Sequence, residues 1–113
     1  MIFRRKLRYI LVESTSALNL ADKAAERSLK AGIRAFMGEA AYFRANPRVA
    51  AQLSDTVFAV SCNRGCEREV ILALAFTKDV GPVRTGLFTI KTSGTMRSLK
   101  SHFEKLYEER TGT

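Results

Sequence analysis

The chain has 113 residues, of which 46% are hydrophobic, so it is long enough and apolar enough to form one folded domain with its own core. Its 19 Lys and Arg residues outnumber its 11 Asp and Glu residues, which gives a formal net charge of +8 at pH 7. This excess predicts an anionic partner, either nucleic acid or a membrane surface. No apolar run reaches the ~18 residues of a membrane span, and the N-terminus lacks the separate apolar region of a signal peptide. We therefore expect a cytoplasmic protein that binds nucleic acid and not a membrane.

Residue types that support catalysis or metal binding are scarce. The two cysteines are Cys62 and Cys66, and His102 is the only histidine, so a closed zinc site lacks ligands. His102 lies in an expected helix, without a second imidazole or a paired nucleophile. We predict reduced thiols, no catalytic residues, and neither a metal nor a cofactor held by this chain.

The sequence of the first half of the chain predicts a strand, a helix and two further strands. Residues 8–15 are typical of a strand because residues 9–12 form a continuous apolar run. Asn19 is expected to be the N-cap of a helix that carries apolar residues at helical spacing and ends at Gly38. Segment 39–46 is either a loop or a short helical turn. Strands are then expected over 47–53 and 56–62.

The sequence of the second half predicts a helix, a strand and a second helix. Asn63 is expected to cap a helix over 64–75. Gly81, with the proline after it, marks a turn before one long strand over 83–92. A last helix over 95–110 carries an apolar stripe. The stripe consists of Met96, Leu99, Phe103, Leu106 and Tyr107.

This order of elements predicts an α+β fold, the split βαββαβ sandwich of ferredoxin-like and RRM-like domains. Two helices then cover one face of an antiparallel sheet, and the extra C-terminal helix can pack on the bare face or an edge. We expect a single domain over 1–113: a basic arm over 1–7, either ordered or disordered, a βαββαβ core over 8–93 and the C-terminal helix over 94–110. Strand 56–62 lacks the aromatic segment of RNA-recognition motifs, so phosphate contacts fit better than base stacking on an open sheet.

Positive charge gathers in two segments that contain no acid, the first eight residues and the stretch between Val80 and Phe103. These segments meet if the first and last strands share one end of the sheet. The corner Ser93-Gly94-Thr95 precedes the last helix, where free backbone N–H groups and the helix dipole suit a phosphate oxygen. The same Ser and Thr are also typical of an ordinary helix N-cap.

Three segments, in this order and spacing, resemble a known family. They are Arg8-Tyr9-Ile10 in the first strand, Cys62-Asn63-Arg64 followed by Val70-Ile71-Leu72-Ala73-Leu74 at the second helix, and Lys91-Thr92-Ser93-Gly94-Thr95-Met96-Arg97-Ser98-Leu99-Lys100 at the start of the last helix. Together they are similar to archaeal ribonuclease P protein component two, from about residue 7 to residue 103. Region 38–52 matches loosely and the C-terminal tail does not match.

The resemblance implies a non-catalytic subunit of the endonuclease complex, a ribonucleoprotein, that removes the 5′ leader from precursor tRNA. The RNA subunit and its bound Mg²⁺ would perform the hydrolysis, and precursor tRNA would be a partner only indirectly. The other expected partners are the ribonuclease P RNA and the TIM-barrel subunit, component three, in a complex that leaves a homodimer or a heterotetramer open. The residues expected to contact RNA are Arg4, Arg5, Lys6, Arg8, Arg64, Arg84, Lys91, Ser93, Gly94, Thr95, Arg97 and Lys100.

Three other interpretations of the protein's function stay open on the sequence alone. One is a generic RNA-binding or ribosomal-type protein of the same topology, which would bind RNA without the TIM-barrel partner. Another is a small hydrolase of the acylphosphatase type, of whose phosphate loop Asn63-Arg64 is only a weak match. A third is a structural dimer built through a sheet edge.

Overall fold

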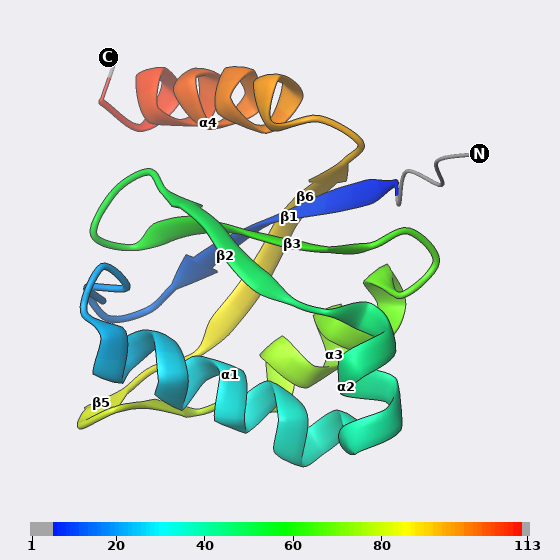
Figure 1. Ribbon diagram of the computed structural model, residues 1–113. Helices are drawn as coiled ribbons and strands as arrows, with labels where there is room; N and C mark the ends of the chain where they lie inside the picture. Colours follow the sequence, from blue (N-terminus) through cyan, green and yellow to red (C-terminus); the bar gives the residue numbers. More distant parts are fainter. Residues whose placement is uncertain (1–5, 112–113) are drawn as a thin grey trace.

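A four-stranded antiparallel sheet organises the chain in the computed structural model, which describes residues 6–111 (Figure 1). The strands are β1 (Leu7–Ser14), β2 (Arg48–Gln52), β3 (Val57–Asn63) and β6 (Leu87–Ser93). They lie in the order β2-β3-β1-β6, so the first and last strands are neighbours although they are far apart in the sequence. This order confirms the predicted split βαββαβ arrangement.

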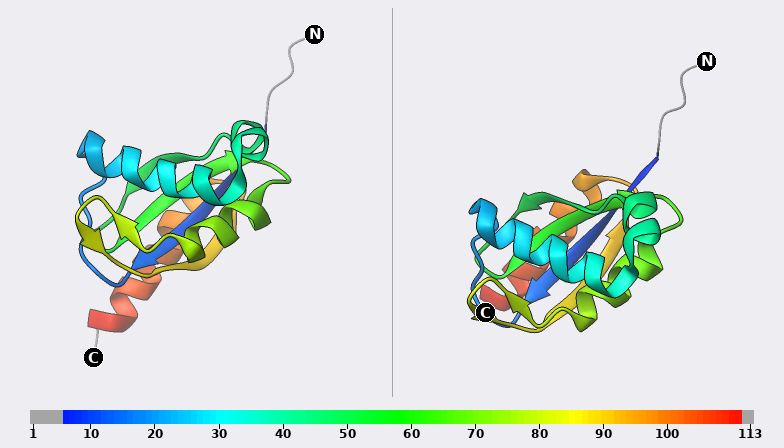
Figure 2. Two further views of the ribbon diagram at one scale, coloured as in Figure 1. Left: turned by 90° about the horizontal axis from the view of Figure 1, so that it is seen from below. Right: turned by 60° about the horizontal axis from the view of Figure 1, so that its bottom comes forward.

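The helices cover both faces of this sheet (Figures 1 and 2). One face packs against α1 (Lys23–Met37) and α3 (Glu67–Phe76), and α4 (Met96–Thr111) lies across the opposite face. Segment 39–46, which was ambiguous by sequence, contains the short helix α2 (Glu39–Ala45). The C-terminal helix therefore uses the bare face of the sheet, one of the two positions expected for it.

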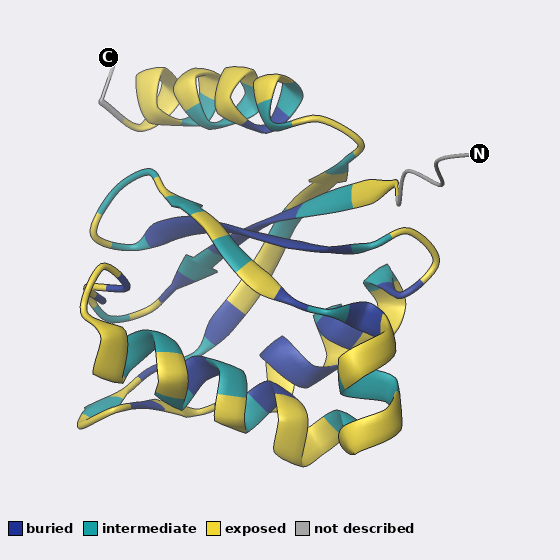
Figure 3. Ribbon diagram, viewed as in Figure 1, coloured by how far each residue is buried: buried dark blue, intermediate teal, exposed yellow. Residues whose placement is uncertain are grey.

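Alternate residues of β1 point into two separate apolar cores. Ile10 and Val12 are fully buried in the core beneath α1 and α3, whereas Leu11 is fully buried in a smaller core beneath α4. In that smaller core Leu11 packs with Leu99 of α4 and Ala59 of β3. β1 is therefore buried on both faces, and its dark colour along the middle of the sheet in Figure 3 reflects this.

The first helix begins later than its sequence predicts. Its N-cap is Asp22, not Asn19, and the Asp22 carboxylate accepts a hydrogen bond from the backbone N–H of Ala24 at 3.2 Å. The Asn19 side chain instead accepts from the N–H of Ala21, so it closes a turn ahead of the helix. Gly38 ends the helix as predicted, with a left-handed φ of 84° that an L-residue rarely adopts.

The start of α3 also differs from the prediction. Asn63 is the last residue of β3 and does not cap the helix, which starts at Glu67 with Cys66 as its N-cap. The chain first makes a turn in which Gly65 has φ 95°, and this turn delays the helix by three residues. The Asn63 side chain is bound elsewhere, because its Nδ2 donates to the carbonyl oxygen of Arg44 at 2.7 Å.

The predicted long strand over 83–92 is two separate strands. β4 (Asp79–Val80) and β5 (Val83–Arg84) form a small hairpin of their own around the Gly81 turn. The chain bends after β5, where the Gly86 N–H donates to Oγ1 of Thr15 at 2.8 Å, and only then enters the main sheet as β6. A contact with the distant Thr15 thus interrupts a strand that looks continuous in the sequence.

Helices α1 and α3 approach each other closely. A Cβ placed on Gly32 of α1 would lie 3.0 Å from the methyl group of Thr77, which follows α3, so the glycine permits this contact. At the C-terminal ends of the two helices, Phe36 and Phe76 stack with ring centroids 5.0 Å apart. Phe36 is nevertheless 46% exposed, so the end of the α1 stripe lies on the surface and not in the core. No helix within residues 6–111 is long and apolar enough to cross a membrane.

The packing of α4 on the sheet gives a first testable prediction. Leu99 is fully buried in the smaller core, so Leu99→Ala should lower the free energy of unfolding by about 2–4 kcal/mol in urea denaturation. The exposed Lys105→Ala on the same helix should change it by less than about 0.5 kcal/mol. Equal stability of the two variants would mean that α4 does not pack on the sheet.

The C-terminal end of α4 gives a second prediction, which concerns pH. Arg110 forms a two-pronged ion pair with Glu13 of β1, and this hydrogen bonding lowers the pKa of Glu13 below its ordinary value of 4.5. Stability from this pair is then fully present above pH 4.5 and is lost as the pH falls through the lowered pKa. Arg110→Gln should lower the free energy of unfolding only slightly at pH 7, because Arg110 is exposed to solvent, and the difference from the parent protein should vanish in acid. A difference that persists unchanged below the pKa of Glu13 would contradict this account.

Candidate nucleic-acid interface

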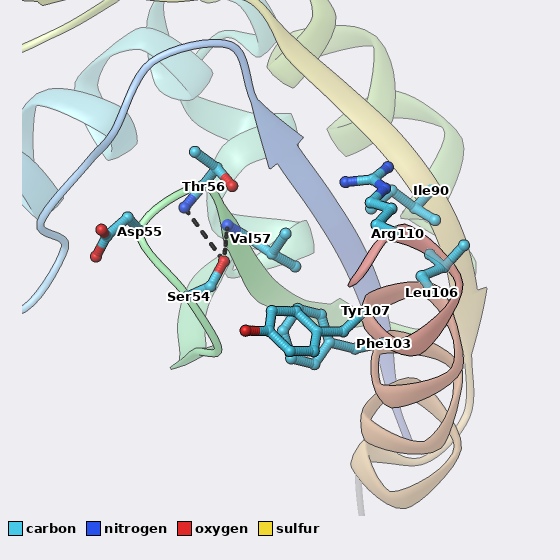
Figure 4. Close-up of a pocket in the computed structure, with 9 residues that line it drawn as sticks. All are labelled: Ser54, Asp55, Thr56, Val57, Ile90, Phe103, Leu106, Tyr107 and Arg110. Carbon is cyan, nitrogen blue, oxygen red and sulfur yellow. Dashed lines mark hydrogen bonds between the residues drawn. The ribbon is translucent and has the colours of Figure 1, made fainter. Parts of the chain in front are cut away.

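A largely apolar cavity lies between α4 and the turn that joins β2 to β3 (Figure 4). It has a volume of about 370 Å³, and Phe103 and Tyr107 face the turn residue Ser54 across it. Ser54 Oγ already accepts hydrogen bonds from the backbone N–H groups of Thr56 and Val57. Ser54 Oγ serves the turn and the Arg110 guanidinium serves the ion pair with Glu13, so these two polar groups of the cavity are already engaged.

The basic residues converge at the opposite end of the sheet strands, where β1 begins. Antiparallel pairing places Tyr9 of β1 opposite Ser93 of β6, and Leu7 opposite Asn63 of β3. The start of β1 therefore lies beside the end of β6 and the loop after β3, at one end of the sheet in Figure 1. Residues 6–8 of the first acid-free segment and the end of β6 in the second come together here.

A basic cleft opens at this meeting point, and we call it the Gly94 cleft. It has a volume of about 360 Å³ and is lined by Lys6, Leu7, Arg8, Arg64 and Gly94. The backbone N–H of Arg64 donates to the carbonyl oxygen of Lys6 at 2.8 Å, which holds the two cationic residues side by side. No acidic residue within 6–111 lines the cleft. The arrangement suits a phosphate group.

Arg8 occupies an unusual position in this cleft. Its Nε atom is buried and has no hydrogen-bond partner among the described residues. Its Nη1 would lie 3.3 Å from a Cβ placed on Gly94, so the absence of a side chain at Gly94 makes room for the guanidinium group. A buried donor without a partner costs free energy, and a ligand oxygen would recover it.

A second cleft adjoins the first, and we call it the Phe43 cleft. It also measures about 360 Å³, and it shares Lys6 and Arg64 with the Gly94 cleft. Its other lining residues are Phe43 and Arg44 of α2 and Asn63 at the end of β3. Sequence reasoning did not single out Phe43 and Arg44, and it considered Asn63 as a helix cap and as part of short motifs, not as a lining residue of a basic cleft. The signal was weak because segment 39–46 had no clear assignment.

The hydroxyl groups of the predicted phosphate corner serve the backbone. Thr95 Oγ1 accepts from the N–H of Ser98 at 3.2 Å, as the side chain of an N-cap does. Ser93 Oγ accepts from the N–H of Thr95 at 3.3 Å. The corner thus caps α4, the alternative weighed for it from the sequence, while Gly94 between the two faces the cleft.

The remaining predicted contact residues do not lie in these two clefts. Arg97 and Lys100 line a separate shallow hollow on α4 together with Glu104. Lys91 is exposed on β6, opposite Leu11.

Arg84 belongs to the β4–β5 hairpin and lies near Thr15, at the other end of β1, so the structure does not bring it to this site. The predicted contacts Arg4 and Arg5 lie outside the described residues.

The thiols are arranged for packing. Cys62 and Cys66 are both free and buried. Burial raises the pKa of Cys62 to about 12, and the nearby charges of Glu67 and of Cys66 add to the shift. A thiol with this pKa is protonated at neutral pH and is a poor nucleophile. The part of the chain that the structure describes contains no group of three or more His, Cys, Asp or Glu side chains able to hold a metal ion.

Comparison with known proteins agrees with the sequence motifs. The model of the Rpp14/Pop5 family matches residues 8–104. A protein of Methanocorpusculum labreanum named "Ribonuclease P protein component 2" is 32% identical over 98 residues, which are 86% of this chain and 65% of that protein. This chain therefore spans slightly less than two thirds of the length of that relative. The resemblance inferred from the three sequence segments is confirmed, and the chain belongs to the Rpp14/Pop5 family.

Proposed function

We propose that this chain is a non-catalytic protein subunit of ribonuclease P that binds and stabilises the catalytic RNA. Membership of the Rpp14/Pop5 family and the name of the Methanocorpusculum labreanum relative support a ribonuclease P subunit. The observation that carries RNA binding is the convergence of Lys6, Arg8 and Arg64 on one cleft without an acidic lining residue. The buried thiols and the lack of a described metal-ligand group give no support to catalysis by the protein.

The proposed mechanism is electrostatic. A folded RNA packs its phosphates closely, and protein cations that neutralise them release condensed counterions. Lys6 supplies a point charge, whereas Arg8 and Arg64 supply planar guanidinium groups that can hold two phosphate oxygens each. The Nε of Arg8, which is buried and lacks a partner, would donate to one of these oxygens once the side chain moves to expose it. Such contacts fix the orientation of the RNA without reading its sequence.

Gly94 would let the RNA backbone approach the cleft closely. A side chain at this position would come within 3.3 Å of the Arg8 guanidinium and would narrow the space for a phosphate. Arg97 and Lys100, in their separate hollow at the start of α4, would extend the basic surface beyond the cleft. Lys91 on the exposed edge strand β6 would do the same.

The chemistry in this proposal belongs to the RNA, whose bound Mg²⁺ ions would perform the hydrolysis of precursor tRNA. The protein would act as part of a ribonucleoprotein with the TIM-barrel subunit, component three, and would hold no cofactor of its own. The cytoplasmic location and the stoichiometry of the complex stay predictions.

A pair of matched variants tests the basic cleft. Arg64→Gln should weaken binding to ribonuclease P RNA by about tenfold or more and lower the slope of log K against log salt by about 1. Arg84→Gln removes the same charge at the other end of β1, so its affinity and slope should match the parent protein. Filter binding at four salt concentrations measures both quantities. Equal effects of the two variants would show that net charge, and not the cleft, governs binding.

Reconstitution tests the subunit role. The cognate RNA, component three and this chain together should cleave precursor tRNA at a Mg²⁺ concentration at which the RNA alone is nearly inactive. The triple variant Lys6→Gln, Arg8→Gln, Arg64→Gln should need more Mg²⁺ for the same rate, because fewer phosphates are neutralised by protein. Cleavage by the purified protein without RNA would overturn the proposal. RNA binding without any effect on cleavage would favour a generic RNA-binding protein.

A further inference from the structure

Phe43 is an exposed aromatic residue in a basic surface. It is 63% exposed although it belongs to the short helix α2, whose buried residue is Ala45. The Phe43 cleft places this ring beside Lys6, Arg44 and Arg64, which come from three different parts of the chain. An aromatic ring among cations is the arrangement that proteins use to hold unpaired nucleotides.

We propose that Phe43 is a stacking platform for one unpaired nucleobase of RNA. The proposal rests on the proposed function and names the part of the RNA that this surface recognises. The Gly94 cleft and the Phe43 cleft share Lys6 and Arg64, so they form one continuous track. A strand whose phosphate lies against Arg8 and Gly94 would pass Lys6 and Arg64 and place its next base at Phe43.

Neighbouring residues hold the ring in place before any ligand binds. The Arg34 guanidinium carbon lies 5.3 Å from the centre of the Phe43 ring, and the Tyr42 ring packs against it edge-on with centroids 5.6 Å apart. Arg34 is itself fixed by an ion pair with Glu39 at 2.5 Å. A ring that is already positioned loses little conformational entropy when a base stacks on it. With 63% of the residue exposed, ring surface remains for the base.

The lining of the Phe43 cleft also supplies a hydrogen-bond acceptor for the polar edge of a base. Asn63 Nδ2 donates to the carbonyl oxygen of Arg44, which fixes the amide group and leaves Oδ1 as an acceptor. Base edges carry N–H donors that such an oxygen can bind, as in other single-strand sites. The volume of about 360 Å³ lies within the usual range of small-ligand sites, roughly 300–1,000 Å³.

A protein partner would need a different surface. The cores of protein interfaces are depleted of charged residues, yet three of the five residues that line this cleft are Lys or Arg. No carboxylate within residues 6–111 lines it either, so the cleft favours an anionic ligand. RNA supplies both the negative charge and the flat apolar base, and we commit to RNA on this ground.

The test compares two RNA probes by fluorescence anisotropy, a hairpin with three unpaired nucleotides bulged from its stem and the same stem fully paired. The parent protein should bind the bulged probe more tightly. Phe43→Ala should weaken binding of the bulged probe by about five- to a hundredfold and leave the paired probe and the salt slope unchanged. Phe43→Trp should keep the preference because it restores a π-face, whereas Phe43→Leu should lose it.

Phe88→Ala is the matched control, because Phe88 is 58% exposed on β6 but lies near Arg84, away from both clefts. Its affinity for both probes should equal that of the parent protein, and urea denaturation should show all variants folded. Equal affinity of the parent protein for the two probes, an equal loss on both with Phe43→Ala, or a loss only of binding to component three would overturn the proposal. If Arg64→Gln still lowers the salt slope, the proposed function survives that result; if it does not, both fail.

Discussion

The antiparallel pairing of β1 with β6 is the contact on which the rest of the molecule depends. It places the first strand in the middle of the sheet, with Ile10 and Val12 in one core and Leu11 in the other. The same register sets Tyr9 opposite Ser93 and so brings the start of β1 to the corner that opens α4. Stability and the candidate site therefore share one structural cause. A shift of one residue in the pairing register of β1 would exchange the side chains on its two faces.

The basic clefts assemble like charges, and this has an energetic consequence. Lys6, Arg8 and Arg64 are held together by backbone hydrogen bonds and strand pairing, and the clefts they line have no acidic lining residue among those described. Their mutual repulsion opposes folding, and the unpartnered Nε of Arg8 adds to that cost. An anionic ligand would reduce both the charge repulsion and the cost of the unpartnered Nε. The geometry that destabilises the free protein would therefore favour RNA binding.

Local sequence signals predicted the elements well and their ends less well. A continuous apolar run identifies β1, which is buried on both faces, and helical periodicity identifies α1 and α4, each of which buries one stripe. Asn63 and residues 83–92 were assigned wrongly because their behaviour depends on distant partners, Arg44 and Thr15, which no local pattern encodes. The meeting of Lys6 with Gly94 was predicted only on the condition that the first and last strands share one end of the sheet, and the meeting of Lys6 with Arg64 was not predicted. Phe43 was missed because the short helix α2 has too few residues to show a period.

The placement of α4 explains why base recognition would lie at the end of the sheet and not on its face. In RNA-recognition motifs of this topology, aromatic residues on the open sheet stack the bases. Here Leu99 and Phe103 of α4 pack on that face, and β3 presents Val57 and Ala59 to them. An aromatic ring instead meets cations from several elements at the rim, where β1 begins and α2 lies against the end of β3. The same fold thus carries nucleic-acid contacts on a different surface, because its binding site depends on which face the additional helix covers.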